Sequence, residues 1–592
     1  MWDPAEHGLA GVTLAEALRR GDLLGFLLGI NGQVLWPFVH ALMLAPWLLV
    51  QGIDYTAAAR LSSVLFAGTV VALCMAGLQL HSARGVWVGT AAAALALLSP
   101  LYRFFGTVCM LEIPGGFLLA LTAGLHIRAC REPAPRPLLV AAGVSTSALF
   151  LCKYNYGMLW LISLMIFEWR SLTDGQRGAM TGRLRAFVKE RRWLRPFPLL
   201  MLALLAAIAA IQVTGGGIIT LPGARISARS SGNLAYALFL LMIGRGAWRV
   251  WGGGGFAAAG SRLSERHRIL IGTVLLPLAV WFLIPYPNRV RALVGFVVNR
   301  DSGHPLWSIE TLLYYPRAFA NEYSPNPFVG WIVLGLAALS PIRRGKGRDP
   351  GTLVALAFWV GLLATATHHY LQPRFLFTTV PLVWLLAASR AVALLEWAID
   401  AERLPGWIRE PIWAGAWVAL LSAALLAAPS AETTLAAHRA FNTPAGVAPV
   451  VDQVLDQARR LETRPWLLGH WNGMSPALVR WQALLARPRL PATQIPEPVP
   501  WLPADTPEST LVARIEALRR AGRPVIAATS DASLAGATGE YWEETRADRR
   551  IRARLSGDPR VRTEAEAILT TSGFRVTTFR FAAPPLVEPL RR

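Results

Sequence analysis

The sequence predicts a mainly α protein: a polytopic transmembrane helical bundle of about 12 spans, followed by a C-terminal α/β domain. Of its 592 residues, 54% are hydrophobic and only 16% are charged, whereas soluble proteins carry roughly 25% charged residues. The apolar residues also gather in runs close to the roughly 20 residues that cross the hydrocarbon core of a bilayer. After Pro429 the chain becomes more polar, and helix-like and strand-like stretches alternate, which predicts the second domain.

Twelve apolar runs are expected to be spanning helices. They cover 58–80, 86–103, 110–128, 137–152, 156–169, 197–214, 232–250, 269–286, 326–342, 351–369, 374–396 and 411–428. A further apolar run, 35–52, would invert every later loop if it crossed the membrane. We therefore expect it to lie along the outer surface as an interfacial helix or a shallow hairpin.

Arginine clusters orient these runs. They follow the first and third runs and recur in 170–196, 245–268 and 343–348, which are alternate loops. Loops rich in lysine and arginine stay on the cytoplasmic side. The other loops and the tail are therefore expected to face outward. The chain then divides into an outer segment with interfacial helices (1–57), the bundle (58–428) and an extracytoplasmic α/β domain (430–592).

The amino terminus carries no cleavable signal peptide, because charged residues interrupt the first 20 positions. An outward amino terminus then implies one of two origins. Either a first helix was lost through a misplaced start codon, or Met1 is an internal methionine of a longer reading frame.

The composition argues against several classes of protein. The net charge of +22 comes largely with the loop arginines, and no nucleic-acid recognition motif accompanies it. The four cysteines lie in or at the ends of apolar runs without CxxC spacing, which indicates neither a disulfide framework nor a metal site. The C-terminal part has helix-like stretches at 447–462 and 509–522 and strand-like runs at 465–471, 523–530 and 573–582. It contains neither GxGxxG nor a P-loop, so no nucleotide site is expected.

Ionisable residues gather in the segments expected on the outer face. They are Asp3, Glu6, His7, Arg60, Arg103, Glu112, Lys153, His368, His369 and Arg374, with Tyr370 beside the histidines. One acidic centre surrounded by cations suits group transfer from a lipid-linked phosphate. A carboxylate takes the proton of an acceptor hydroxyl, and cations hold the departing phosphate as its charge grows.

Most of these residues also have a plain structural interpretation. Asp3 could be a solvated terminal acid, and Glu6 and His7 could be solvated helix residues. Arg60, Lys153 and Arg374 could be interfacial side chains that snorkel to water. The histidine pair lacks a third ligand at suitable spacing, so no metal site is expected there. No cofactor is expected either; a divalent metal is compatible with the sequence but not indicated by it.

The order of the motifs resembles one family. WDPAEHG, ALRRGD, WPFVHALML, AAARLSSVLFAG, LSPLYRFFGTVCMLEIPGG, FLCKYNYG and HHYLQPRFLFTTVPL follow one another over about 1–400. This order is similar to that of the GT-C membrane glycosyltransferases, nearest to the group of protein O-mannosyltransferases and aminoarabinose transferases.

The resemblance implies roles for individual residues. Asp3 matches the acidic catalytic residue of the first outer loop, and Glu112 matches the acidic residue ahead of a proline in the second. Both are expected to be catalytic. Arg60, Lys153 and Arg374 match cationic residues of the family. Together with His369, they are expected to bind the phosphate of the donor. Glu6, His7, His368 and Tyr370 are assigned to substrate binding. Two departures stand out: the family's first helix is absent, and Leu35-Trp36-Pro37 replaces a Lys-Pro-Pro common in aminoarabinose transferases, so that donor is not assumed.

The resemblance implies a glycosyltransferase in the plasma membrane of a bacterium. It would move a sugar, with inversion, from a polyprenyl-phosphate donor to an acceptor hydroxyl of a protein, lipid or glycan on the extracytoplasmic face, with Asp3 as general base. Its expected partners are this donor, the acceptor and membrane lipids, and no nucleic acid. A transporter or lipid flippase is the alternative, but it would need broken helices at midplane and internal repeats. A non-catalytic membrane scaffold is a further alternative.

Overall fold

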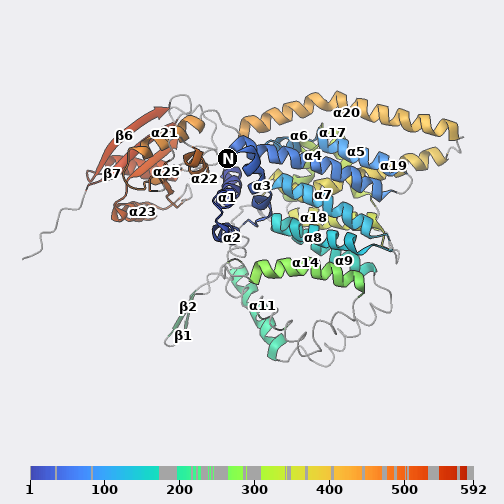
Figure 1. Cartoon of the computed structure of the whole chain (residues 1–592), viewed down its shortest axis with the longest axis horizontal. Coiled ribbons are helices and arrows are strands. Elements are labelled where there is room, and N and C mark those ends of the chain that lie inside the picture. The colour runs from blue at the N-terminus through green and yellow to red at the C-terminus, as the bar shows by residue number, and fades with distance from the viewer. Residues whose placement is uncertain are drawn as a thin grey trace, which may run out of the picture.

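The computed structural model describes most of the chain. It covers 2–33, 36–81, 84–131, 133–171, 196–214, 218–221, 224–227, 264–283, 309–340, 348–366, 371–401, 406–442, 447–469, 476–485, 493–500, 506–530, 546–569 and 574–582, with positions 238, 241, 245, 289, 342, 490, 491 and 502; at 2–4 it describes only the backbone. Figure 1 shows a helical bundle, a smaller domain with a sheet, and three short helices between them.

The three short helices form the amino-terminal segment. They are α1 (Trp2–Arg19), α2 (Leu23–Asn31) and α3 (Val39–Gln51). Gly21, with φ of 67°, turns the chain after α1, and the Asp22 carboxylate then caps α2 by accepting from the Gly25 amide at 2.7 Å. In Figure 1 these helices run across the ends of the bundle helices.

The bundle follows the predicted apolar runs closely. Its elements are α4 (Tyr55–Leu80), α5 (Gly85–Leu98), α6 (Pro100–Phe105), α7 (Glu112–Ala129), α8 (Arg136–Cys152), α9 (Tyr154–Ser171), α11 (Pro196–Thr214), α14 (Glu265–Leu283), α16 (Ile309–Glu322), α17 (Pro327–Ala338), α18 (Pro350–Ala366), the 3₁₀ helix η2 (Pro373–Thr378), α19 (Val380–Ala401) and α20 (Gly406–Asn442). The run 86–103 divides at Pro100, which begins α6. The run 232–250 lies outside the described residues, apart from three single positions. Helix α20 continues past the predicted boundary at 428–430.

The predicted number of about 12 spans is not confirmed. Among the described helices, two are long and apolar enough to cross a membrane: Tyr55–Leu80 and Val380–Ile399. Six further apolar helices are shorter. The outer faces of the bundle nevertheless carry large apolar side chains that are more than half exposed, namely Val71, Met75, Val86, Met165, Leu276, Phe328, Trp397 and Leu426. Soluble monomers rarely expose so much apolar surface, so this surface indicates a membrane protein.

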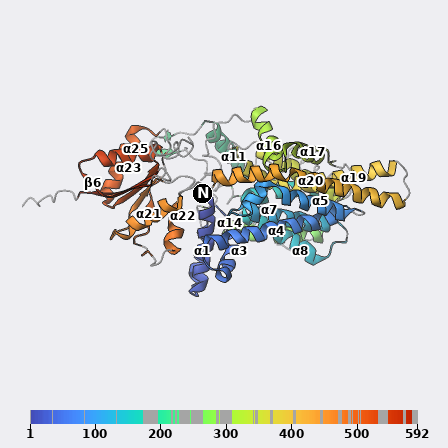
Figure 2. The ribbon, with the colours of Figure 1, turned by 90° about the horizontal axis from the view of Figure 1, so that it is seen from above.

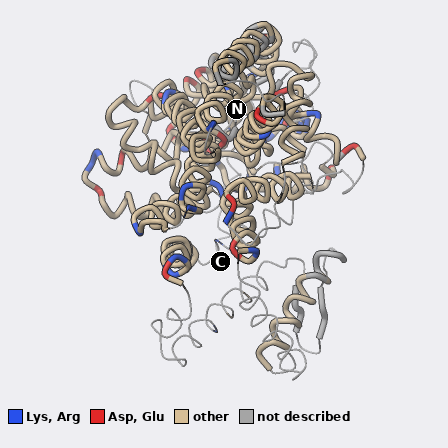
Figure 3. Tube along the Cα trace, turned by 90° about the vertical axis from the view of Figure 1, so that its right-hand side faces the viewer, with Lys and Arg blue, Asp and Glu red and all other residues tan. Residues whose placement is uncertain are grey.

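Charged side chains join the helices at one end of the bundle, here called the arginine end. Arg84 approaches Glu396, Arg136 pairs with Glu265, and Arg266 and Arg348 both reach Glu168. These residues belong to the alternate loops or adjoining helix ends that were predicted to share one side of the membrane. The antiparallel succession of helices therefore brings these described arginines to one end of the bundle, and Figure 3 shows charged residues where the described chain turns.

Helices α4 and α5 approach each other through glycine. A Cβ added at Gly77 would come within 2.4 Å of the Gly89 Cα, and one at Gly89 within 2.4 Å of the Cys74 carbonyl oxygen. Small residues allow such backbone contact, which supplies packing where water provides no hydrophobic drive. The pair of α4 and α5 therefore requires glycine at both positions.

The C-terminal domain is α/β, as predicted. Its elements are α21 (Val447–Arg459), β3 (Trp466–Leu468), α22 (Pro476–Leu485), β4 (Glu497–Pro498), α23 (Glu508–Ala521), β5 (Val525–Ser530), α25 (Arg546–Gly557), β6 (Val561–Leu569) and β7 (Phe574–Phe581). The strand order is β4-β3-β5-β7-β6, with β3 parallel to β4 and β5 and the other pairs antiparallel. A separate hairpin, β1 (Ile218–Leu221) with β2 (Ala224–Ser227), lies elsewhere in the chain.

Alternation along the strands builds two apolar layers in this domain. Ile526 and Ala528 pack with α21 and α22, whereas Val525 and Ala527 pack with α23 and α25. Successive side chains of a strand point to opposite faces of the sheet. Helices therefore cover both faces, and one of them, α22, also contacts α1.

Replacement of Gly77 by leucine should destabilise the bundle, because the side chain would meet the backbone of α5 rather than a movable side chain. We expect a loss of about 1–3 kcal/mol or more, measured as a lower midpoint of thermal unfolding in detergent. Gly335→Leu is the matched control, since an added Cβ there meets nothing within 4 Å. Equal midpoints for the two variants would contradict the close contact.

Candidate active site

A buried ion pair marks the end of the bundle opposite the arginine end. Lys153 Nζ donates to Glu112 Oε1 at 2.7 Å, and their side chains are 10% and 1% exposed. A pair so removed from water is stable only when both partners are present, because a single buried charge is costly. Both residues were candidates from the sequence, and the structure brings them together.

Local structure places each partner at a helix end. Glu112 opens α7, where the helix dipole favours a negative charge, and Pro114 occupies the first turn, where its missing N–H costs nothing. Lys153 ends α8 with extended backbone (φ −156°, ψ 119°), and α9 begins at the next residue. Because α7 and α8 are consecutive and antiparallel, the start of one meets the end of the other.

Two glycines of α7 admit two tyrosines to the pair. A Cβ on Gly115 would lie 2.8 Å from the Tyr156 ring, and one on Gly116 would lie 2.0 Å from the Tyr102 hydroxyl. Both tyrosines are buried. Glu112 Oε2 and both phenol oxygens have no hydrogen-bond partner among the described residues. Buried polar groups normally have partners, so this cluster is a place where a polar ligand would complete the hydrogen bonding.

Trp36 connects the ion pair to a cavity of about 290 Å³. The Lys153 ammonium lies 6.0 Å from the centre of the Trp36 ring, at the outer limit of a cation–π contact. The cavity is lined by Glu6, His7, Ala10, Gly32, Gln33, Trp36, Pro37, His40, Ala41 and Leu111. Leu111 directly precedes Glu112, so the ion pair stands beside one wall of this cavity.

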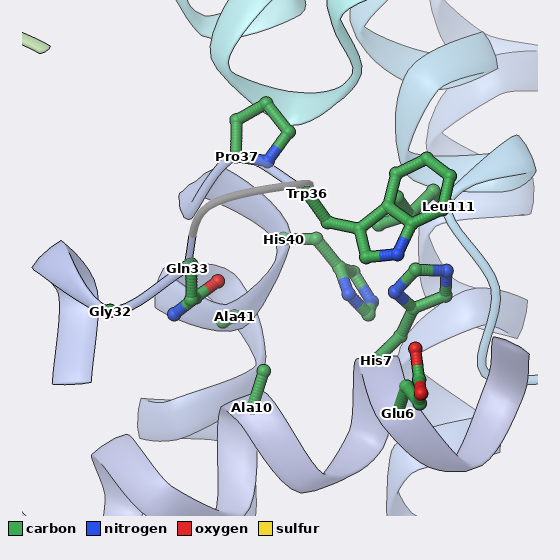
Figure 4. A pocket seen from close by; sticks show the side chains of 10 residues that line it. All are labelled: Glu6, His7, Ala10, Gly32, Gln33, Trp36, Pro37, His40, Ala41 and Leu111. Carbon is green, nitrogen blue, oxygen red and sulfur yellow. The ribbon is translucent and has the colours of Figure 1, made fainter. Parts of the chain in front are cut away.

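Two histidine rings and the indole converge in the cavity (Figure 4). The His7 ring meets Trp36 edge-on at 5.4 Å and His40 at 6.2 Å between ring centres. His40 belongs to α3, which lies across the bundle end rather than along the bundle axis. Burial and, to a smaller extent, the nearby His7 lower the pKa of His40 to about 3. His40 is therefore neutral at pH 7 and can donate or accept a hydrogen bond.

The structure places the other predicted residues less uniformly. Arg374 lies half-buried in η2, which packs against α7 and α9, and its Nε donates to Gln372. Arg60 is exposed on α4 and does not line the cavity. Arg103 pairs with Glu432 of α20 at 2.5 Å. His368, His369 and Tyr370 lie outside the described residues.

Asp3 lies in the first turn of α1, three and four residues before Glu6 and His7. Residues at this spacing share one face of a helix, and the side chains of Glu6 and His7 line the cavity. The backbone of α1 therefore puts position 3 at the cavity end of that face.

No role was predicted for four further residues of this site: Trp36, His40, Tyr102 and Tyr156. The two adjacent glycines after Glu112 were the available signal, because paired glycines in an apolar helix indicate close approach of another group. Among the residues that the structure describes, no group of three or more His, Cys, Asp or Glu side chains is arranged to hold a metal ion.

Comparison with known proteins gives likenesses of structure. No family model matches the chain, and no curated protein matches it. It is similar to the crystal structure of ArnT from Cupriavidus metallidurans bound to undecaprenyl phosphate (13% identity, TM-score 0.48, covering 98% of this chain and 94% of that one). It is also similar to the archaeal oligosaccharyltransferase AglB from Archaeoglobus fulgidus in complex with an inhibitory peptide and a dolichol-phosphate (13%, 0.45, 94% and 67%).

Both are GT-C fold glycosyltransferases, the group that the sequence motifs resemble. With identities of 13% and TM-scores below 0.5, this likeness carries no conclusion about activity or substrate.

Removal of one partner of the ion pair should cost more stability than removal of both. Lys153→Met leaves a carboxylate buried and unpaired, and we expect a loss of about 3–5 kcal/mol. The double variant Glu112→Leu/Lys153→Met should recover most of this loss. The measurement is the unfolding midpoint of the two single variants, the double variant and the wild type in one detergent. Additive losses would show that the two side chains do not form a coupled pair.

Proposed function

We propose that this protein is a membrane glycosyltransferase that uses a polyprenyl-phosphate-linked sugar. It would transfer the sugar to an acceptor hydroxyl on the extracytoplasmic face of a bacterial plasma membrane. The single observation that carries the proposal is the buried cluster of Glu112, Lys153, Tyr102 and Tyr156 beside the cavity, with polar atoms that lack partners among the described residues. The order of the sequence motifs supports the same reaction class.

The proposed chemistry is a single displacement. The acceptor oxygen attacks the anomeric carbon from the side opposite the phosphate, and the Asp3 carboxylate takes the hydroxyl proton. The bond between that carbon and the phosphate oxygen breaks, and its electron pair leaves with the polyprenyl phosphate. The configuration at the carbon therefore inverts.

The cations stabilise the departing phosphate. Lys153 is the best placed of them, because it is buried next to the cavity wall and a low local dielectric strengthens its field. Arg374, Arg60 and His369 complete the proposed phosphate-binding set. Glu112 orients Lys153 through its Oε1 and leaves Oε2 to accept from a substrate hydroxyl.

The cavity suits one sugar ring. Its volume of about 290 Å³ lies just below the range of pockets for drug-sized ligands, roughly 300–1,000 Å³. Trp36 offers an apolar face to a sugar ring, and Glu6, His7 and Gln33 offer polar atoms to its hydroxyls. His368 and Tyr370 are proposed as further substrate-binding residues.

Helix α2 provides a path for the lipid chain. Leu23, Leu24, Leu27 and Leu28 are each more than half exposed, and α2 carries no charge. The helix is followed directly by Gly32 and Gln33, which line the cavity. An isoprenoid chain that lies along these leucines would have its phosphate end next to the site.

The first test is Asp3→Asn. With a synthetic polyprenyl-phosphate sugar and purified full chain, turnover should fall by about 10²–10⁴-fold, the usual contribution of a general base. The variant should still co-purify with the donor lipid, which mass spectrometry would detect. Glu16→Gln, at the other end of α1, is the control and should keep wild-type turnover.

Two results would contradict the proposal. One is wild-type protein that turns over no polyprenyl-phosphate sugar. The other is a mass spectrum in which both the wild-type protein and Asp3→Asn co-purify with ordinary phospholipid alone. Together they would favour a transporter or a scaffold.

A second test asks whether α2 binds the lipid chain of the donor, independently of the sugar. Leu24→Ser/Leu27→Ser should raise the KM for a long-chain donor about tenfold, equivalent to roughly 1.4 kcal/mol of lost apolar contact, with kcat unchanged. A donor with a two-isoprene chain should show no such difference. Leu199→Ser, an exposed leucine of α11, is the control. An unchanged KM for the long-chain donor would exclude α2 from lipid binding.

A further inference from the structure

Helix α22 of the C-terminal domain has two buried faces. Val479 and Ala483 belong to the core that this domain forms with α21 and the sheet. Ala477 and Trp481 belong instead to a core formed with α1, α3 and α4. Residues four apart share a helix face, and residues two apart do not. The helix is therefore part of its own domain on one side and part of the cavity-bearing helices on the other.

Trp481 lies directly on the backbone of α1. The side chain is 1% exposed, and a Cβ added at Gly8 would come within 1.9 Å of its Cζ3 and 2.3 Å of its Cη2. Tyr55 packs beside the indole at 5.5 Å between ring centres. The indole N–H donates to no acceptor among the described residues, so packing holds the ring. Only glycine at position 8 leaves room for it.

Two other contacts fix α1 in the same way. A Cβ at Gly11 would meet Leu44 of α3 at 2.5 Å, and one at Gly29 of α2 would meet Leu14 at 2.8 Å. Each contact places a side chain against helix backbone, and well-packed contacts of this kind resist small displacements. Trp481 is the member of this set that comes from the C-terminal domain.

Gly8 directly follows His7, and His7 and Glu6 line the cavity. A shift of α1 at Gly8 would therefore move these groups, and the helix turn that carries Asp3, relative to Glu112 and Lys153. Displacement of a reacting group by about 1 Å can lower a rate by 10²-fold.

We propose that Trp481 is a positioning residue: by seating on Gly8 it couples the C-terminal domain to the position of α1 at the candidate active site. The catalytic part of this inference rests on the proposed glycosyl transfer. The mechanical part, that Trp481 holds α1 in place, does not.

The experiment compares five variants of the full chain in detergent. Trp481→Ala removes the indole. Gly8→Ala pushes a methyl group against its outer ring, and Gly8→Ala/Trp481→Phe makes room for that methyl group by removing the ring atoms nearest to it. Trp481→Phe alone is the conservative change. Val479→Ala truncates the opposite face of α22 and is the control for loss of domain packing.

Two readouts are measured for each variant. The first is kcat and KM for the lipid donor; the second is hydrogen exchange of the amides of residues 5–12, with those of α21 as internal reference. Trp481→Ala and Gly8→Ala should each lower kcat roughly 10–100-fold. The donor KM should rise by a smaller factor, because Lys153 and Arg374 lie outside α1 whereas Glu6 and His7 lie on it. The double variant should regain most of the kcat lost in Gly8→Ala. Exchange in α1 should rise in Trp481→Ala and stay at the wild-type level in Val479→Ala.

Unchanged α1 exchange in Trp481→Ala would overturn the proposal, and so would a double variant no more active than Gly8→Ala. An equal kcat loss in Val479→Ala would also overturn it, because the effect would then come from the domain's own stability. Wild-type protein without transferase turnover would overturn the proposed function instead. Hydrogen exchange alone would then show whether Trp481 holds α1 in place.

Discussion

The buried pair of Glu112 and Lys153 is the constraint on which the candidate active site depends. A carboxylate and an ammonium group that are almost fully removed from water can remain charged only while each neutralises the other. Their separation of 2.7 Å fixes the start of α7 against the end of α8. Tyr102 and Tyr156 then reach the pair because Gly115 and Gly116 leave space on α7. The charges, the glycines and the tyrosines therefore form one arrangement.

The two ends of the bundle use charge differently. At the arginine end, Glu168 is shared by Arg266 and Arg348, so acids and bases from different helices balance one another. At the other end, buried oxygens of Glu112, Tyr102 and Tyr156 lack protein partners among the described residues. The ion pairs of Glu168 stabilise the bundle, whereas the buried oxygens without partners destabilise it. Uncompensated polar groups of this kind are expected where a protein binds a substrate rather than where it only holds itself together.

The amino-terminal helices connect the bundle to the C-terminal domain (Figure 2). Helix α1 supplies one wall of the cavity, α3 supplies His40, and the segment between α2 and α3 supplies Trp36. Helices α2 and α3, with 9 and 13 residues, are too short to be stable alone in water. The position of the amino-terminal helices comes from contacts with α4, α8 and α22, so the cavity depends on elements far apart in the sequence.

The helices of the bundle, the α/β character of the C-terminal domain and the common end at which Glu112, Lys153 and Arg374 lie could all be predicted from the amino-acid sequence. Length of an apolar run and alternation of arginine-rich loops suffice for this, because each follows from transfer of groups between water and hydrocarbon. Three contacts could not be predicted in this way: the pairing of Glu112 with Lys153, the place of Trp36 between this pair and the cavity, and the packing of Trp481 on Gly8. Most helices of the bundle are apolar on every side, so their sequence carries no amphipathic face to indicate which neighbour each one meets. That choice is made by close packing at glycines and by buried charges, and these interactions exist only once the chain has folded.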